Sequence, residues 1–259
     1  MAPKPTLLLV AGLTLAACAQ APVAETTPHP VSSLVVIRPT PTPTATPSPT
    51  PTRSPAATVT FSVPVYKQTM NLDCETAALQ MALAAIGHYY TQAALFTYEK
   101  PDKTPPVTGP IVNGYRTVKQ WGDPYTNFVG DVNGADLIPT GYGIYWPLLT
   151  SIARSHGAPG AVGKEDWSAA EIYAVVAAGH PVEAWTETGW ARPPVGYWTA
   201  WDHRQIRYSI IEHTVVLSGV SATQVRVNDP WHQGSQYWIS KRQFEISWAD
   251  FNNMAIVFQ

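Results

Sequence analysis

Apolar residues recur at helical spacing in the segment NLDCETAALQMALAAIG, residues 71–87. The residues that share the predicted apolar face are Leu79, Leu83 and Ile86, with alanines beside them. Gly87 follows them as a typical helix terminator, and Asp73 is a residue type that favours the N-cap position. The pattern predicts an amphipathic or buried helix with Cys74 in its first turn.

Two runs rich in β-branched residues follow later in the chain, EHTVVLSGV at 212–220 and QVRVNDPW at 224–231. A short turn separates them, so they predict an antiparallel β-hairpin in which Pro230 ends the second strand. The start of the first strand then lies beside the end of the second. We therefore expect His213 to lie close to the pair Asn228–Asp229.

The N-terminal 58 residues do not have the pattern of a folded domain. Lys4 precedes an apolar run that is too short for an ordinary membrane span. This run ends in LAAC, which resembles a bacterial lipobox with Cys18 as the lipidated residue. The prediction is a lipoprotein signal peptide over residues 1–18; the alternative is an ordinary secretory signal that contains a chance cysteine.

Residues 19–58 are rich in proline and threonine, for example RPTPTPTATPSPTPTRSP at 38–55. Alternating prolines remove backbone donors and favour an extended linker. Residues 59–259 are long enough for one domain with a sizeable core. We therefore expect this domain to be lipid-anchored to the membrane in a bacterial cell envelope, facing outside the cytoplasm.

Composition narrows the function classes. The chain has 259 residues, a formal net charge of −2 and only 13% charged residues, but 10 Trp and 12 Tyr. No basic stripe indicates a nucleic-acid partner. The sequence has no CxxC or HExxH zinc motif, and DVNGAD at 131–136 lacks the glycine and glutamate positions of an EF-hand. We expect no metal and no cofactor.

Cys74 is the only cysteine outside the predicted signal peptide. Exported proteins usually pair their cysteines, so an unpaired thiol is either buried and inert or kept for chemistry. A helix N-terminus would lower the pKa of the thiol, which favours a nucleophile. A cysteine that only packs under the helix is the alternative.

Other polar residues could complete a nucleophilic site. His213 could accept the thiol proton, and Asp229 or Asn228 could orient its imidazole. Gln68, six residues before Cys74, could stabilise an oxyanion together with the Cys74 backbone N–H. Taken singly, each also has a purely structural interpretation: a strand-edge histidine, a turn aspartate or a polar loop glutamine.

Together these motifs resemble the C39-like peptidases of the papain-like superfamily. Four stretches carry the resemblance: QTMNLDCETAALQMALAAIG; WGDPYTNFVGDVNG with GYGIYWPLL; AAGHPVEAW; and EHTVVLSGV, VRVNDPW and WISKRQFEISW. The resemblance implies an α+β papain-like fold, with a central helix packed on an antiparallel β-sheet. It implies Cys74 as nucleophile, His213 as base, Asp229 as the orienting residue and Gln68 in the oxyanion hole.

The chain departs from many members of this group at Glu75-Thr76, where they have Gly-Pro. The Glu75 charge could raise the pKa of the thiol and so bears on activity. Three tryptophans between the strand at 181–185 and His213 either flank the substrate cleft or pin down their own loop: Trp190, Trp198 and Trp201.

The resulting hypothesis is a surface-anchored cysteine peptidase acting on peptide or related amide bonds. Two alternatives stay open: a non-catalytic module that binds cell-wall peptide or glycan, and an acyl or peptidyl transferase that uses the same thioester.

Overall fold

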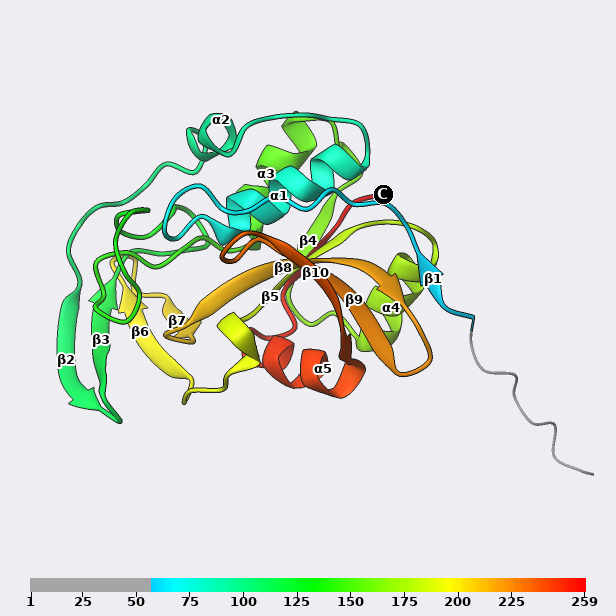
Figure 1. The fold of residues 1–259 in the computed structure, drawn as a ribbon. Coiled ribbons are helices and arrows are strands. Elements are labelled where there is room, and N and C mark those ends of the chain that lie inside the picture. Colours follow the sequence, from blue (N-terminus) through cyan, green and yellow to red (C-terminus); the bar gives the residue numbers. More distant parts are fainter. Residues whose placement is uncertain (1–56) are drawn as a thin grey trace, which may run out of the picture. The chain divides into compact units, whose positions relative to one another are not determined.

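The computed structural model describes residues 57–259, and two β-sheets organise this part of the chain (Figure 1). The larger sheet has the strand order β10-β9-β8-β5-β11-β4, with β1 also paired to β8. All its strand pairs are antiparallel. Its strands are β1 (Val59–Thr60), β4 (Val162–Lys164), β5 (Val182–Glu187), β8 (Glu212–Val220), β9 (Gln224–Asp229), β10 (Ser235–Ser240) and β11 (Ala255–Val257).

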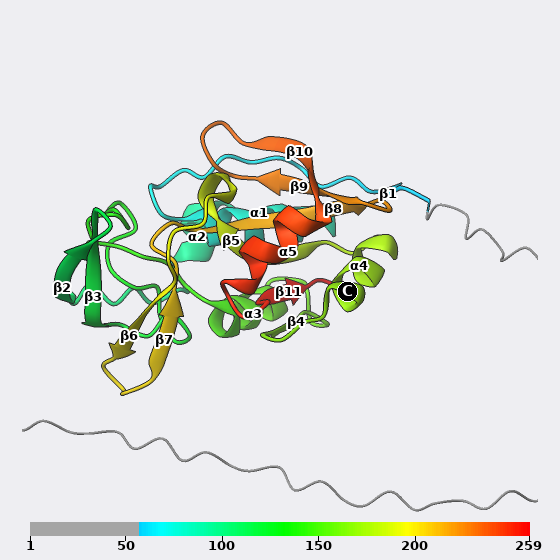
Figure 2. The ribbon, with the colours of Figure 1, turned by 90° about the horizontal axis from the view of Figure 1, so that it is seen from below.

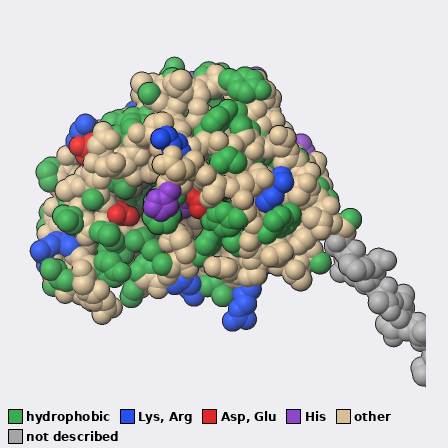
Figure 3. All heavy atoms as spheres, viewed as in Figure 1, with side chains coloured by type: hydrophobic (Ala, Val, Ile, Leu, Met, Phe, Trp, Pro, Cys, Tyr) green, Lys and Arg blue, Asp and Glu red, His purple; other side chains and the backbone are tan. Residues whose placement is uncertain are grey.

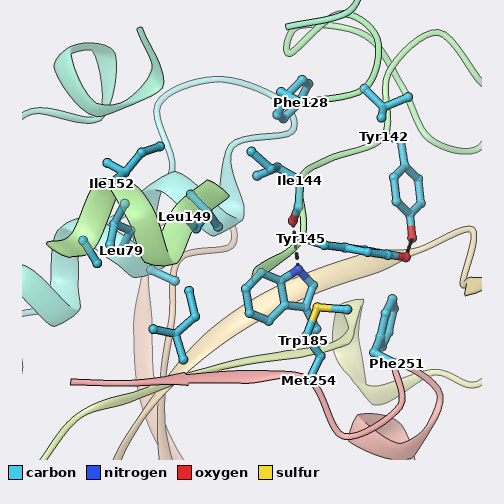
Figure 4. Close-up of a cluster of buried hydrophobic side chains, with 14 of the residues drawn as sticks. Leu79, Phe128, Tyr142, Ile144, Tyr145, Leu149, Ile152, Trp185, Phe251 and Met254 are labelled. Atoms are coloured by element: carbon cyan, nitrogen blue, oxygen red, sulfur yellow. Dashed lines mark hydrogen bonds between the residues drawn. The ribbon is translucent and has the colours of Figure 1, made fainter. Parts of the chain in front are cut away.

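Helices cover both faces of this sheet, because alternate residues of its central strands point to opposite sides. Trp185 and Val216 belong to a core shared with α1 (Cys74–Ala85) and α3 (Trp146–Ser155). Their neighbours Ala184 and Val215 belong to a second core, shared with α4 (Ala169–Ala177) and α5 (Lys241–Ala249). Figure 4 shows the first core, in which the Trp185 indole N–H donates to the carbonyl of Ile144, 3.0 Å away.

A smaller sheet lies at one end of the domain (Figures 1 and 2). Its strand order is β2-β3-β6-β7, in which β3 and β6 are parallel. The strands are β2 (Val107–Val112), β3 (Tyr115–Trp121), β6 (Gly196–Ala200) and β7 (Gln205–Tyr208), and the short helix α2 (Gln92–Phe96) precedes them. Trp121 and Trp198 pack against each other in it, with ring centroids 5.9 Å apart.

The predicted helix is confirmed: α1 begins at Cys74, ends at Ala85 and is followed by Gly87 with φ +92°. Asp73 holds the N-cap position, but its side chain does not cap the helix. Its carboxylate instead accepts hydrogen bonds from the Met70 N–H and the Thr69 hydroxyl, at 3.0 and 3.4 Å. Asp73 thus shapes the loop that enters α1.

The predicted hairpin is also confirmed, as β8 and β9 with Val216 opposite Asn228. The α+β fold predicted from the sequence is confirmed as a helix, α1, packed on an antiparallel sheet. Within residues 57–259, none of the helices has the length and apolarity needed to cross a membrane. The expected signal peptide, Cys18 and most of the expected linker lie outside the described residues.

Candidate active site

Cys74 and His213 line the same cavity, which has a volume of about 330 Å³. Cys74 comes from the start of α1, and His213 comes from the start of β8. Gln68 lines the cavity from the loop before α1, and Asp136 and Leu137 line it from a second loop. Figure 3 shows histidine and acidic side chains reaching the surface together near the middle of one face. The fold therefore brings together polar groups that are up to 145 residues apart in the sequence (213 − 68).

His213 is held by a carboxylate from the neighbouring strand. Its Nε2 lies 2.7 Å from Asp229 Oδ1, and both side chains are buried. Since a carboxylate accepts, this geometry assigns the proton to Nε2 and leaves Nδ1 as the free nitrogen of a neutral ring. Nδ1 of His213 is therefore the ring nitrogen that could accept a proton.

Asp229 is in turn fixed by two further donors. Its Oδ1 accepts from the Trp231 N–H at 2.9 Å, and its Oδ2 accepts from the Tyr237 hydroxyl at 2.7 Å. Burial opposes ionisation of Asp229, but the hydrogen bonds from His213, Trp231 and Tyr237, together with the positive charge of His213 when it is protonated, outweigh burial and lower the pKa of Asp229 to about 2. Asp229 is therefore a carboxylate at neutral pH.

Asn228 points away from this site. Its Nδ2 donates to the carbonyl of Val63 at 2.9 Å, and its Oδ1 accepts from the Ser218 hydroxyl at 2.7 Å. Successive residues of a strand face opposite sides, so only one member of the pair Asn228–Asp229 can face His213. The residue that contacts His213 is Asp229.

The Cys74 thiol lies against carboxyl groups. Its Sγ is 3.2 Å from Glu75 Oε2 and 3.8 Å from Glu212 Oε2. Only 5% of Cys74 is exposed, and both glutamates are buried. Burial raises the pKa of the thiol well above its usual range, and the negative charges of Glu212 and Glu75 raise it further. The prediction that the helix start lowers this pKa is therefore wrong, because burial and two nearby carboxyls outweigh the helix dipole.

Gln68 lies at the wall of the cavity, with its amide turned toward the backbone. Its Nε2 donates to the carbonyls of Asn71 and Met70, at 2.7 and 3.3 Å. Its Oε1 is buried and has no hydrogen-bond partner. The Cys74 backbone N–H has no acceptor among the described residues. This N–H is therefore a candidate donor for an oxyanion.

The three tryptophans named from the sequence do not line the cavity. Trp198 is 1% exposed and donates from its indole to the Gly122 carbonyl, as a core residue would. Trp201 follows β6 and is exposed. Trp190 donates to the Tyr237 hydroxyl at 3.0 Å, so it contacts the residue that holds Asp229. The tryptophan at the cavity wall is Trp231, which is 40% exposed.

Sequence reasoning missed Glu212, Tyr237 and Asp136. Glu212 directly precedes His213, so its position next to a candidate base was the signal that could have marked it as a site residue. Tyr237 and Asp136 carried no comparable signal, since their contacts depend on how β10 and the loop at 131–140 fold back on the site.

The thiol and the two glutamates are also the group in residues 57–259 whose atom types could suit a metal ion, with ligand atoms within 4.8 Å of one another. These atoms already bond one another and their surroundings: Glu75 Oε1 accepts from the Ile144 N–H at 2.7 Å, and Glu212 Oε1 accepts from the Thr214 hydroxyl at 3.2 Å. We therefore assign the group to the chemistry of the thiol.

Comparison with known proteins identifies the domain. The sequence profile of the Peptidase_C39 like family matches residues 60–256. The chain belongs to this family. Over 189 residues it is 26% identical to the uncharacterized protein YvpB of Bacillus subtilis strain 168, covering 72% of this chain and 68% of YvpB.

A solved structure supports the same assignment. The crystal structure of a C39-like peptidase from Bacillus anthracis superimposes with a TM-score of 0.65 and 26% identity. The match covers 78% of this chain and 98% of the solved chain. The resemblance to C39-like peptidases inferred from the sequence motifs is thereby confirmed, and the domain is peptidase-like.

Proposed function

We propose that this C39-like domain is a cysteine peptidase that hydrolyses peptide or related amide bonds. The observation that carries the proposal is the His213–Asp229 pair: the two side chains are 2.7 Å apart, and His213 lines the cavity that Cys74 also lines. A thiol, an imidazole and a carboxylate that orients the imidazole are the minimum set for thioester chemistry.

In the proposed reaction, the Cys74 sulfur turns toward His213 and transfers its proton to Nδ1. The sulfur then attacks the carbonyl carbon, and the oxyanion accepts a hydrogen bond from the Cys74 N–H. The Gln68 amide supplies a second donor when the oxyanion displaces a loop carbonyl from it. His213 next gives the proton to the leaving amine as the C–N bond breaks.

Hydrolysis of the thioester completes the cycle. His213 takes a proton from water, and the resulting hydroxide adds to the thioester carbonyl. The C–S bond breaks, the carboxylic acid leaves and the sulfur recovers the proton. Asp229 stays ionised throughout and stabilises the imidazolium that forms twice per turnover.

The N-terminal sequence supports a proposal for where this happens. Lipidation at Cys18 and the Pro/Thr-rich segment after it would hold the domain outside the cytoplasm, at a bacterial membrane. Mass spectrometry of the mature N-terminus tests this: a diacylglycerol-modified Cys18 is expected. An unmodified peptide that starts beyond Cys18 contradicts lipid anchoring.

The activity is tested by incubating the purified domain with a diverse peptide library and reading cleavage by mass spectrometry. We expect cleavage products that disappear in Cys74→Ala and in His213→Ala. A matched control is His156→Ala, because His156 hydrogen-bonds the Ile152 carbonyl in α3 and does not line the cavity. Cleavage that survives Cys74→Ala contradicts the proposal.

A further inference from the structure

The Cys74 sulfur is enclosed by two carboxyl groups that the described hydrogen bonds hold in place. Sγ, one oxygen of Glu75 and one oxygen of Glu212 all lie within 4.8 Å of one another. Glu75 is fixed by the Ile144 N–H at 2.7 Å, and Glu212 is fixed by the Thr214 hydroxyl at 3.2 Å. The carboxyl pair, Glu75 and Glu212, therefore has a defined position beside the nucleophile.

The backbone makes room for this pair at Gly143. A Cβ atom on Gly143 would lie 2.1 Å from Glu75 Oε1 and 3.0 Å from Glu212 Oε2. No side chain fits there without displacing a carboxyl group. The chain thus brings both carboxyls to the thiol through three separate segments: the start of α1, the start of β8 and the loop before α3.

No cation among residues 57–259 compensates the charge of the carboxyl pair. Neither glutamate forms an ion pair with lysine or arginine among residues 57–259. Cys74, Glu75 and Glu212 form a trio of titratable groups. The other titratable groups that face or act on this trio are Asp73 from the loop before α1, Glu99 from the turn after α2, Asp136, Tyr142 and Tyr145 from the loops before α3, Glu183 from β5 and His213 from β8. All except His213 are acidic or neutral.

Removal of protons from this trio is therefore ordered. The Glu75 pKa is raised to about 7, chiefly by burial, and burial also raises the pKa of Glu212. The first proton lost from the trio leaves a carboxyl, and the thiol keeps its own proton and donates a hydrogen bond to the carboxylate that forms. A thiolate formed next would lie within 4 Å of a like charge in a buried site, and this repulsion disfavours the thiolate.

We propose that Glu75 and Glu212 hold Cys74 as a protonated, unreactive thiol in the resting enzyme, so that the nucleophile is released only when the sulfur turns from the carboxyl pair to His213. This inference deepens the proposed function and, for its role in catalysis, rests on it. The step moves one proton, from sulfur to imidazole nitrogen, and breaks no other bond. Rotation of the Cys74 side chain away from Glu75 is the event that activates the site.

The inference predicts the shape of a pH profile. The rate of thiol alkylation follows the thiolate fraction. In the wild-type chain, this rate should rise up to about pH 7, where Glu75 ionises. Above that pH it should level off, because the fraction of molecules with un-ionised Glu75 falls as fast as rising pH favours the thiolate. In Glu75→Gln the neighbour cannot ionise, so the rate should continue to rise by about tenfold per pH unit.

The test measures alkylation of Cys74 by iodoacetamide in the full domain between about pH 5 and pH 9, by intact-mass spectrometry. At the alkaline end, Glu75→Gln should react at least about tenfold faster than wild type. Glu212→Gln, which removes the second charge, should shift the profile in the same direction. The matched control is Asp123→Asn, since Asp123 is a buried carboxyl that interacts with Tyr125, Arg204 and Asp202 and not with the sulfur or the carboxyl pair; its profile should match wild type.

Peptide cleavage on the same samples separates this inference from the proposed function. If the Glu75→Gln and Glu212→Gln profiles both match wild type, or if both variants react more slowly, the inference is wrong even where cleavage is seen. If both profiles shift as expected and no peptide is cleaved, the inference about the resting thiol stands and the peptidase proposal fails.

Discussion

His213 Nε2 lies 2.7 Å from Asp229 Oδ1, across two adjacent antiparallel strands and 16 residues apart in the sequence. The bond holds the imidazole with its other nitrogen free, on the wall of the cavity that contains Cys74. Tyr237 and Trp190 extend it into a chain of hydrogen bonds, from indole to hydroxyl to carboxylate to imidazole. The orientation of the base is therefore set by residues on three strands and the turn after β5.

The first prediction concerns this chain. Asp229→Ala should lower kcat by about 10²-fold or more, because His213 loses both its orientation and the charge that stabilises its imidazolium. Tyr237→Phe should cost less than about tenfold, since it removes one hydrogen bond and leaves the carboxylate in place. Steady-state kinetics on a cleaved library peptide measures both. Equal losses in the two variants would mean that Tyr237, not the Asp229 charge, governs the base.

The second prediction concerns stability between about pH 5 and pH 8. Burial raises the pKa of Asp73 to about 6, of Glu75 to about 7 and of Glu187 to about 8. Such a carboxyl binds its proton more tightly when folded than when unfolded. Its stabilisation is present below the unfolded pKa of about 4 and is lost as pH rises through the folded pKa.

The Tm should accordingly fall from pH 5 to pH 8. A loss of about 1 kcal/mol corresponds to roughly 2–4 °C in a domain of this size. Asp229 does not oppose this trend, because its lowered pKa places its own transition below about pH 4. Glu187→Gln should reduce the fall, measured by thermal unfolding monitored by circular dichroism. A Tm that rises over this pH range contradicts the prediction.

The third prediction tests the space reserved for the carboxyl pair. Gly143→Ala should lower the free energy of unfolding by about 1–3 kcal/mol, because the new Cβ overlaps Glu75 Oε1. The control is Gly122→Ala, whose Cβ would meet its nearest atom, Asp102 Oδ2, at 3.1 Å. Urea unfolding should show the larger loss at Gly143. If Gly122→Ala is the more damaging change, Glu75 is free to move aside.

The fourth prediction separates the tryptophans. Trp198→Ala should cost about 3–5 kcal/mol of folding free energy, because the indole is buried against Trp121 and Tyr142. Trp231→Ala should leave Tm almost unchanged but raise KM for a cleaved peptide, since Trp231 is exposed at the cavity wall. Thermal unfolding and steady-state kinetics measure the two effects. A KM for Trp231→Ala equal to the wild-type value would exclude substrate contact.

Local patterns were sufficient for the elements that carry the site. The apolar spacing after Cys74 determines a helix, and the β-branched runs at 212–220 and 224–231 determine a hairpin. Hairpin geometry alone then places His213 beside the end of the second strand. These features depend on neighbours in the sequence, so periodicity and turn signals encode them.

Only the tertiary structure decided the chemistry around the thiol. The choice between Asn228 and Asp229 depended on which alternate face of β9 looks toward His213. Glu212 is 138 residues from Cys74 in the sequence, yet 3.8 Å separates its carboxylate from the sulfur. Helix position favours a low thiol pKa, but burial and two carboxyls raise it. The sequence alone could determine where the cysteine stands on its helix; its protonation depends on charges that only the folded chain brings within reach, because electrostatic interactions act through space and not along the chain.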